Sequence, residues 1–370
     1  MSGAPASGSP VGQQTPHGPP YLPRTAQIGG VPTVSVDVPI SAVLLFLFVC
    51  GAATHMTILQ VNRRRDHKFL FSGMLFGFCM ARIVALTMRM VWATHSTNIN
   101  VAIASGIFTQ AGVLLLFVVN LIFSQRMVRA YRPRFGWHRT TTVVFRTLYC
   151  CVVALLIMVV TATVQSFFTL DKGTLHSDRI VQLFAVTFLA ALAFLPIPIV
   201  TAAALLPGRQ AEPLDKFGQG RFRTKVRLLL FTATILALGA GFRAGAAYDV
   251  RPINHPAWYH HKACYYCFNY AIELIMVYTY AITRFDRRFH VPDGSSGPGH
   301  YSAGRVRKQE PYSDSGRRPS FIADHIGREA DTFGSDGNDD SDGLAEQPSS
   351  RDDTQGWSEG AKKGSPDSDV

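Results

Sequence analysis

Seven long apolar segments recur along the chain, separated by polar stretches rich in Arg and Lys. Each could cross a membrane as a helix, because about 20 residues at a rise of 1.5 Å span roughly 30 Å of hydrocarbon. Their apolar residues do not alternate at every second position, as the strands of a membrane β-barrel would. The pattern therefore predicts an all-α membrane protein, a bundle of seven transmembrane helices over residues 38–60, 69–93, 101–124, 143–166, 179–206, 226–247 and 261–283.

The Lys and Arg residues that flank these segments predict how the bundle is oriented. Nineteen fall on one side, within residues 62–68, 125–146, 207–227 and 284–288, and three fall on the other, Arg24, Lys172 and Arg251. Positive residues concentrate in cytosolic loops. With an odd number of helices, we expect the N-terminus outside and the C-terminus in the cytosol, most simply at the plasma membrane.

The two ends of the chain differ in composition from the apolar region. Residues 1–37 are rich in Pro, Gly and Ser, and residues 291–370 hold 16 of the 25 acidic residues and 9 of the 36 basic ones. Such segments bury too little apolar surface to fold alone. We expect a disordered extracellular tail (1–37), a transmembrane domain (38–290) and a disordered acidic cytosolic tail (291–370). In the last, Arg317-Arg318-Pro319-Ser320 makes Ser320 a candidate phosphorylation site.

The composition and motifs also narrow the class of function. Hydrophobic residues make up 47% and charged residues only 16% of the chain, whereas a soluble protein has about 25% charged residues. There is no Gly-rich phosphate loop and no Gly-x-Ser-x-Gly elbow. We therefore expect no enzymatic activity, no catalytic residues and no cofactor. The Arg-rich aromatic stretch 129–139 is expected to meet anionic lipids of the inner leaflet, not nucleic acid.

Four charged residues lie away from the ends of the predicted helices, and a charge costs about 2.5–3.5 kcal/mol at the membrane centre. Arg82 and Glu273 lie near the middle of the second and seventh segments, whereas Arg89 and Arg243 lie nearer the outer end. We expect Arg82 and Glu273 to form an ion pair inside the bundle. The pair could be part of a ligand-binding cavity. The alternative is a purely structural role, in which the pair holds the helices in register and binds no ligand.

A polar stripe in the seventh segment supports a buried site. Its residues alternate at spacings of three and four, which places them on one face of a helix. We call this set the polar seam: Tyr266, Asn269, Glu273, Met276 and Tyr280. Arg89 and Arg243, with Tyr266 and Asn269, are predicted to line an outward-facing cavity for an anionic or amphiphilic ligand, such as a lipid phosphate or a carboxylate.

The cysteines and histidines offer a second, weaker candidate site. All six cysteines fall in predicted helices, so Cys264 and Cys267, three residues apart, are best explained as small buried side chains on one helix face. His260 and His261 precede Cys264 by about one turn. These three side chains could together bind zinc or copper at the outer mouth of the seventh helix.

The sixth and seventh segments resemble the end of the fungal RTA-like family of seven-span lipid-translocating exporters. Phe242-Arg243 matches the aromatic-arginine pair of that family. His261-Lys262 stands where the family has His-Glu, and Tyr266-Cys267-Phe268-Asn269 stands where it has Tyr-x-Phe-Asp, so both acids are missing here. Residues 38–290 as a whole resemble a family of seven-span proteins of filamentous fungi with unknown function, which implies topology and kingdom but no activity.

Three functions remain open from the sequence. The first is translocation of a lipid or amphiphile across the membrane, or a stress tolerance that depends on such translocation. The second is a receptor that signals through its basic inner loops, although the third segment ends in Gln125-Arg126-Met127, without the acid-arginine-aromatic triplet common in such receptors. The third is a structural membrane scaffold. The oligomeric state is open as well.

Overall fold

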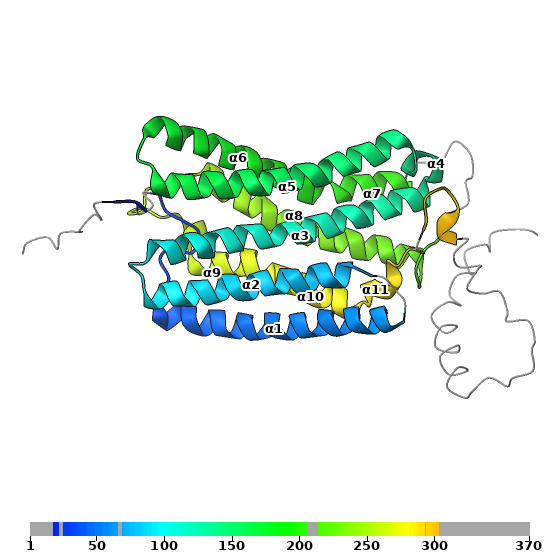
Figure 1. Cartoon of the computed structure of the whole chain (residues 1–370), viewed down its shortest axis with the longest axis horizontal. Helices are drawn as coiled ribbons and strands as arrows, with labels where there is room; N and C mark the ends of the chain where they lie inside the picture. Colours follow the sequence, from blue (N-terminus) through cyan, green and yellow to red (C-terminus); the bar gives the residue numbers. More distant parts are fainter. Residues whose placement is uncertain (1–17, 22–24, 66–68, 206–213, 293, 303–370) are drawn as a thin grey trace, which may run out of the picture.

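The computed structural model describes residues 18–21, 25–65, 69–205, 214–292 and 294–302. Within these residues no strand forms, apart from an isolated bridge between Thr25 and Pro252. Long helices pack side by side along one direction (Figure 1). The elements are α1 (Val34–Arg64), α2 (Phe71–Thr94), α3 (Ile99–Tyr131), α4 (Pro133–Gly136), α5 (Arg139–Phe168), α6 (Lys172–Phe194), α7 (Pro196–Leu205), α8 (Phe222–Tyr248), η1 (Trp258–His260), α9 (Lys262–Tyr266), η2 (Cys267–Ala271), α10 (Ile272–Ile282) and α11 (Phe285–Arg288).

Six helical segments of the described chain are long and apolar enough to cross a membrane: α1, α2, α3, α5, α8, and α6 together with α7. The chain is therefore an all-α, multi-pass integral membrane protein. The seventh predicted segment is divided into α9, η2 and α10, because a π-turn over Cys267–Ala271 interrupts the α-helical hydrogen bonding.

The fifth predicted helix breaks where its prolines predict a kink. α6 ends at Phe194 and α7 begins at Pro196. A proline within a helix has no N–H to donate and its ring displaces the preceding turn. The hydroxyl of Thr201 donates to the carbonyls of Ile197 at 2.8 Å and Pro198 at 3.2 Å, which keeps these carbonyls bonded in an apolar setting.

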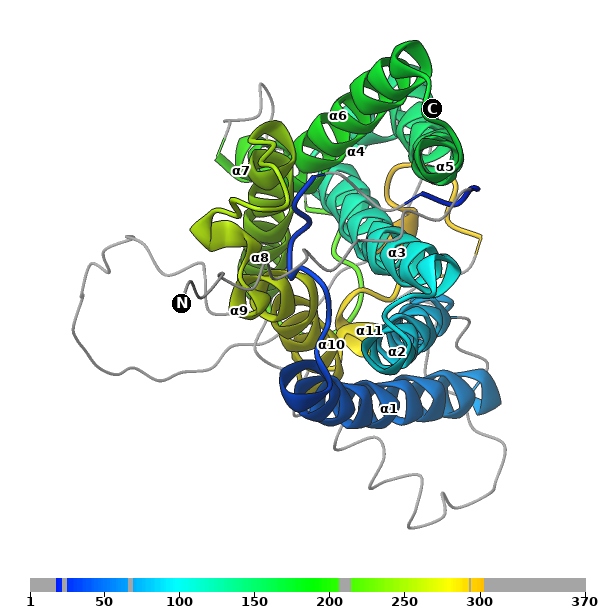
Figure 2. The same ribbon diagram turned by 90° about the vertical axis from the view of Figure 1, so that its left-hand side faces the viewer.

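The packing of the helices places the polar seam inside the bundle. α2 packs between α1 and α3, α6 packs against α5 and α8, and α10 contacts both α1 and α8. Figure 2 shows this arrangement from the end, with α9 and α10 between α1 and α8. All members of the seam are at most 5% exposed.

Part of the N-terminal region is folded onto the bundle, contrary to the prediction of a disordered tail over residues 1–37. Residues 25–33, here called the outer strap, cross the end of the bundle that is predicted to face outside and is called the outer end (Figure 2). The N–H of Ala26 donates to the Arg251 carbonyl and that of Gly29 to the His260 carbonyl, each at 2.9 Å. These backbone contacts, together with the packing of Ile28 against the core, hold the strap on the bundle. Residues 1–17 and 22–24 lie outside the described residues.

The end of the bundle that is predicted to face the cytosol is also more folded than its composition predicts. The carboxylate of Asp215 accepts hydrogen bonds from the backbone N–H groups of Gly299, Tyr301 and Ser302 at 3.0, 3.4 and 2.7 Å. Tyr301 is 2% exposed and contacts the ring of Trp137. The predicted boundary at residue 291 is therefore too early. Residues 303–370, including the candidate phosphorylation site Ser320, lie outside the described residues.

Candidate functional site

Arg82 of α2 and Glu273 of α10, which the sequence pairs, are in contact inside the bundle. Nε of Arg82 lies 2.5 Å from Oε2 of Glu273, and Nη2 donates to Oε1 at 2.6 Å. The two side chains are 0% and 1% exposed. Nη1 of Arg82 donates to the Thr109 carbonyl at 2.6 Å, so hydrogen bonds from two helices surround the guanidinium. A buried ion pair needs hydrogen bonds to its remaining donors, and this carbonyl supplies one of them.

The backbone of α3 makes room for the Arg82 guanidinium. A Cβ atom added to Gly112 would lie 3.3 Å from Cζ of Arg82, so a small residue is needed here. The rings of Phe78 and Tyr270 lie 5.3 and 5.5 Å from the same carbon and add cation–π attraction. These contacts hold the guanidinium in one position.

Arg243 of α8 is a second cation on the same carboxylate. Its Nη1 lies 3.7 Å from Oε1 of Glu273 and donates to Oδ1 of Asn269 at 3.3 Å. The side chain is 12% exposed, in contrast to Arg82. Phe242, next in sequence, stacks on Phe268 with ring centres 3.9 Å apart. Arg243 therefore shares Glu273 with Arg82, and its side chain is more exposed than that of Arg82.

The π-turn η2 sets the direction of the groups around Arg243. π-turns are rare within α-helices and occur frequently at functional sites. Here the turn contains Asn269, whose Nδ2 donates to the Tyr265 carbonyl at 3.0 Å while its Oδ1 accepts from Arg243. Because both ends of the amide are bonded, Asn269 holds the Arg243 side chain against the seam.

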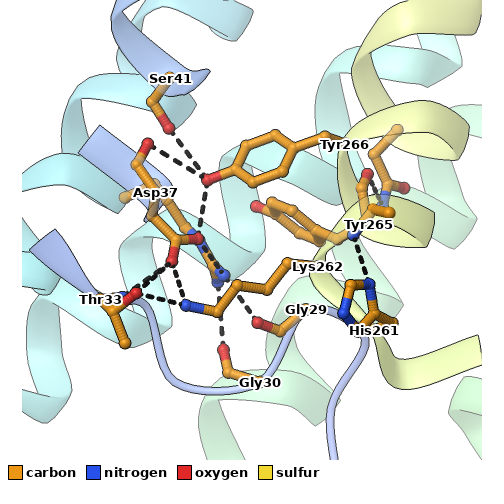
Figure 3. Close-up of polar contacts among 12 residues, drawn as sticks. Gly29, Gly30, Thr33, Asp37, Ser41, His261, Lys262, Tyr265 and Tyr266 are labelled. Atoms are coloured by element: carbon orange, nitrogen blue, oxygen red, sulfur yellow. Dashed lines mark hydrogen bonds and ion pairs between the residues drawn. The ribbon is translucent and has the colours of Figure 1, made fainter. Parts of the chain in front are cut away.

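A second ionic cluster lies beneath the outer strap, where α1 begins (Figure 3). Its centre is Asp37 of α1, which is completely buried. Lys262 and Arg89 approach its carboxylate at 2.5 and 2.9 Å. The Tyr266 hydroxyl and the Thr33 N–H each donate to it at 2.7 Å. Like Glu273, this carboxylate is shared by two cations.

Arg89 does not line an open cavity, which corrects the sequence-based prediction. It is 3% exposed, and besides Asp37 it donates to the carbonyls of Gly29 and Gly30 at 2.8 and 3.3 Å. Its Cζ lies 4.3 Å from the centre of the Tyr265 ring. The outer strap supplies the carbonyls, and the strap was expected to be disordered. Of the four residues predicted to line the cavity, only Arg243 and Asn269 lie beside Glu273, and Tyr266 belongs to the outer cluster.

Sequence analysis missed Asp37 as a site residue because the first apolar segment was taken to begin at residue 38. An acidic residue in the first turn of a helix is favourable on its own, through the helix dipole, and so indicates no particular partner. Lys262 was noted only as the residue that replaces a glutamate of the exporter family, and it contacts Asp37. Asn269, which replaces an aspartate of that family, contacts Arg243.

Hydroxyl groups connect the two clusters. The Tyr265 and Tyr270 hydroxyls lie 3.1 Å apart, and the Tyr270 hydroxyl lies 3.0 Å from Oγ1 of Thr109. The carbonyl of Thr109 in turn accepts from Arg82. Polar groups thus continue from the outer end of the bundle to the central ion pair.

The predicted metal site is not formed in the described part of the chain. No group of three potential ligands converges there. Nδ1 of His260 accepts from the Ala257 N–H, and Nδ1 of His261 accepts from the Ala263 N–H, each at 3.2 Å. Both imidazoles therefore serve the backbone at the start of α9, and Cys264 stands as a free thiol.

Comparison with known proteins identifies one similar segment. A family model described as a protein of unknown function (DUF3112) matches residues 218–290. This segment includes Arg243, Lys262 and Glu273, whereas Asp37 and Arg82 lie outside it. Neither the curated proteins nor the solved structures contain a match. The chain is thus similar to a family without an assigned activity, and its resemblance to lipid-translocating exporters stays a prediction.

Proposed function

We propose that this protein is a seven-span membrane protein that binds the anionic head group of an amphiphile at Arg243 and moves it across the bilayer. The seventh span would be α9, η2 and α10, which together cover residues 262–282. Their 21 residues (282 − 262 + 1) correspond to about 30 Å of helix. In Figure 1 they extend beside α1 along most of the bundle. The excess of positive residues in the expected inner loops supports an N-terminus outside.

The observation that carries this proposal is the state of Arg243. A guanidinium has five N–H donors. Within the described chain, the acceptors in reach of Arg243 are Asn269 at 3.3 Å and Glu273 at 3.7 Å. Arg82, its neighbour, already occupies both carboxylate oxygens. A partly accessible arginine with unused donors at membrane depth is suited to a phosphate or a carboxylate.

Polar groups at other depths support movement and not binding alone. Towards the cytosol from Glu273, the Tyr280 hydroxyl donates to Oδ1 of Asn120, and Thr232 lies 3.4 Å from the same oxygen. Towards the outside, the tyrosine hydroxyls lead to the Asp37 cluster. A head group that passes along α10 would meet hydrogen-bonding partners at successive levels and would never be fully desolvated.

Reconstitution in liposomes with fluorescent anionic lipid tests this function. We expect transbilayer lipid movement with the native protein and at least a tenfold loss with Arg243→Ala, since a hydrogen bond to a charged group contributes about 1.5–3 kcal/mol. Arg251→Ala is the matched control, because Arg251 is an outer arginine that is 52% exposed. Equal rates for native protein and Arg243→Ala would contradict the proposal. Binding of lipid without movement would favour the receptor interpretation.

Two further parts of the proposal are a non-enzymatic role and residence in the plasma membrane. The first rests on the lack of catalytic motifs in the sequence. Imaging of a fluorescent fusion tests the second, and retention of the folded protein in an internal membrane would contradict it.

A further inference from the structure

The charges around Glu273 do not balance. Arg82 and Arg243 contribute two positive charges and Glu273 contributes one negative charge, so the formal net charge is +1 (2 − 1). Each of these side chains is at most 12% exposed. An uncompensated charge inside a membrane protein costs several kcal/mol, and such charges are normally paired.

The other groups packed around this cluster do not supply the missing negative charge. Cys79 and Tyr270 are neutral in their ordinary states, and Asn269 contributes only an amide oxygen. Asp37 is already shared by Lys262 and Arg89 at the outer end.

Two more carboxylates complete this comparison. Asp178 of α6 is buried, but it forms no ion pair with Arg243 in the described structure. Asp286 lies in α11, near the cytosolic end, and is bound by Asn62. The central cluster therefore keeps its excess positive charge.

We propose that the ligand of this cluster carries a single negative charge, as a phosphodiester or a carboxylate does, and not the double charge of a phosphomonoester. This inference rests on the proposed function, because it concerns the head group bound at Arg243. One negative charge brings the cluster to zero. A second charge would leave a net −1 in the bundle, which is again unfavourable for a charge at membrane depth.

The geometry is compatible with such a ligand. The planar fork of a guanidinium matches two oxygens of a phosphodiester or a carboxylate. Asn269 bonds only one nitrogen of Arg243 at 3.3 Å, which leaves the other edge of the fork for the ligand. Glu273 would remain bound to Arg82, so the ligand would displace no existing hydrogen bond of that pair.

The test measures lipid binding to the full-length protein in nanodiscs of phosphatidylcholine that contain either phosphatidylglycerol or phosphatidic acid. Phosphatidylglycerol keeps one charge, whereas a phosphomonoester gains its second charge with a pKa of about 6. We expect phosphatidylglycerol binding to be equal at about pH 5 and about pH 8, and phosphatidic acid binding to fall at least tenfold over this range. Phosphatidic acid binding that is unchanged or stronger at the higher pH would overturn the proposal.

Two charge-neutralising variants test the charge count directly. Arg243→Gln brings the cluster to zero, and we expect it to bind phosphatidylglycerol no better than phosphatidylcholine. Glu273→Gln brings the cluster to +2, and we expect it to prefer phosphatidic acid at about pH 8, where that lipid is doubly charged. An unchanged preference in folded Glu273→Gln would contradict the proposal. If this variant does not fold, the pH series on the native protein decides the question.

Further arms separate the possible causes of a negative result. Dimethyl phosphate added to phosphatidylcholine nanodiscs distinguishes a free monoanion from a lipid head group, and binding of either form supports the charge rule. Equal binding of both anionic lipids at each pH would refute the charge rule but leave the proposed function intact. If neither anionic lipid binds better than phosphatidylcholine, the proposed function itself fails.

Discussion

Removal of Glu273 should destabilise the protein more than removal of Arg82, because two guanidiniums share this carboxylate. In Glu273→Leu, Arg82 and Arg243 lose their carboxylate while they remain 0% and 12% exposed. In Arg82→Met, the carboxylate keeps Arg243, whose Nη1 lies 3.7 Å from Oε1. The two substitutions break the same ion pair but leave different numbers of unpaired charges.

The expected magnitudes follow from these contacts. Breaking a buried ion pair by removal of one partner costs about 3–5 kcal/mol, and we expect Glu273→Leu to reach the upper end of this range. For Arg82→Met we expect about 1–3 kcal/mol, since Arg243 re-pairs the carboxylate and only the carbonyls of Phe108 and Thr109 lose this donor. The difference should therefore be about 2 kcal/mol.

The measurement is reversible unfolding of the purified protein in mixed micelles, followed by circular dichroism. Arg251→Ala serves as the control, because Arg251 and Asp249 form an exposed ion pair, with side chains that are 52% and 49% exposed. An exposed pair of this kind contributes about 0–1 kcal/mol. The control shows what the loss of an arginine does when no buried charge is left behind.

Two results bear on the reasoning itself. If Arg82→Met is as destabilising as Glu273→Leu, Arg243 does not share the carboxylate and the argument is refuted. The triple variant Arg82→Met, Arg243→Met and Glu273→Leu should recover most of the lost stability, because buried ion pairs can often be replaced by apolar residues of similar volume.

Three further substitutions test the outer end. Asp37→Asn should cost about 3 kcal/mol in the same unfolding assay, because it leaves two cations beside a neutral group. Lys262→Ala should cost less, since this cation is 23% exposed, and an equal cost would contradict the geometry. Gly29→Ala should displace the outer strap and increase its cleavage by protease, because Gly29 has φ +84° and an added Cβ would lie 2.6 Å from an aromatic carbon; unchanged cleavage would argue against this contact. Finally, hydrogen bonds from the backbone and side chain of Thr174 lower the pKa of Asp171 from 3.8. The Asp171 cap of α6 should therefore be fully formed above pH 3.8 and be lost as the pH falls through the lower pKa of the folded state. Protection of the Thr174 amide, taken relative to the intrinsic exchange rate at each pH, should fall in that acidic range in the native protein but stay low throughout in Asp171→Ala, and pH-independent protection in the native protein would refute the assignment.

The apolar pattern was sufficient to predict six helical segments of membrane-spanning length but not their ends. The third predicted helix ended at residue 124, whereas α3 continues to Tyr131. Arg126 lies in this extension, donates to the Phe289 carbonyl at 2.5 Å and contacts the Phe71 ring. A basic residue near a membrane edge predicts a loop, but here neighbouring segments give it partners and the helix continues.

The pairing of Arg82 with Glu273 could be anticipated because few charges share the same membrane depth. These residues are 191 positions apart, yet unpaired charges in the bundle are costly enough to limit the choice of partner. The role of Arg243 as a second cation on the same carboxylate could not be anticipated. It depends on the π-turn, which shifts Asn269 and Glu273 relative to an uninterrupted α-helix.

The sequence by itself determined that this is a multi-pass helical membrane protein with a few charges inside it, because hydropathy and charge act on each segment independently of its neighbours. The tertiary structure alone decided which charges are satisfied. Arg89 is bound by Asp37, 52 positions away, and by the carbonyls of a polar strap that no hydropathy pattern marks as folded. Arg243 is left with spare donors because Arg82 reaches Glu273 more closely. Partners of this kind depend on distances between distant parts of the chain, and packing sets those distances.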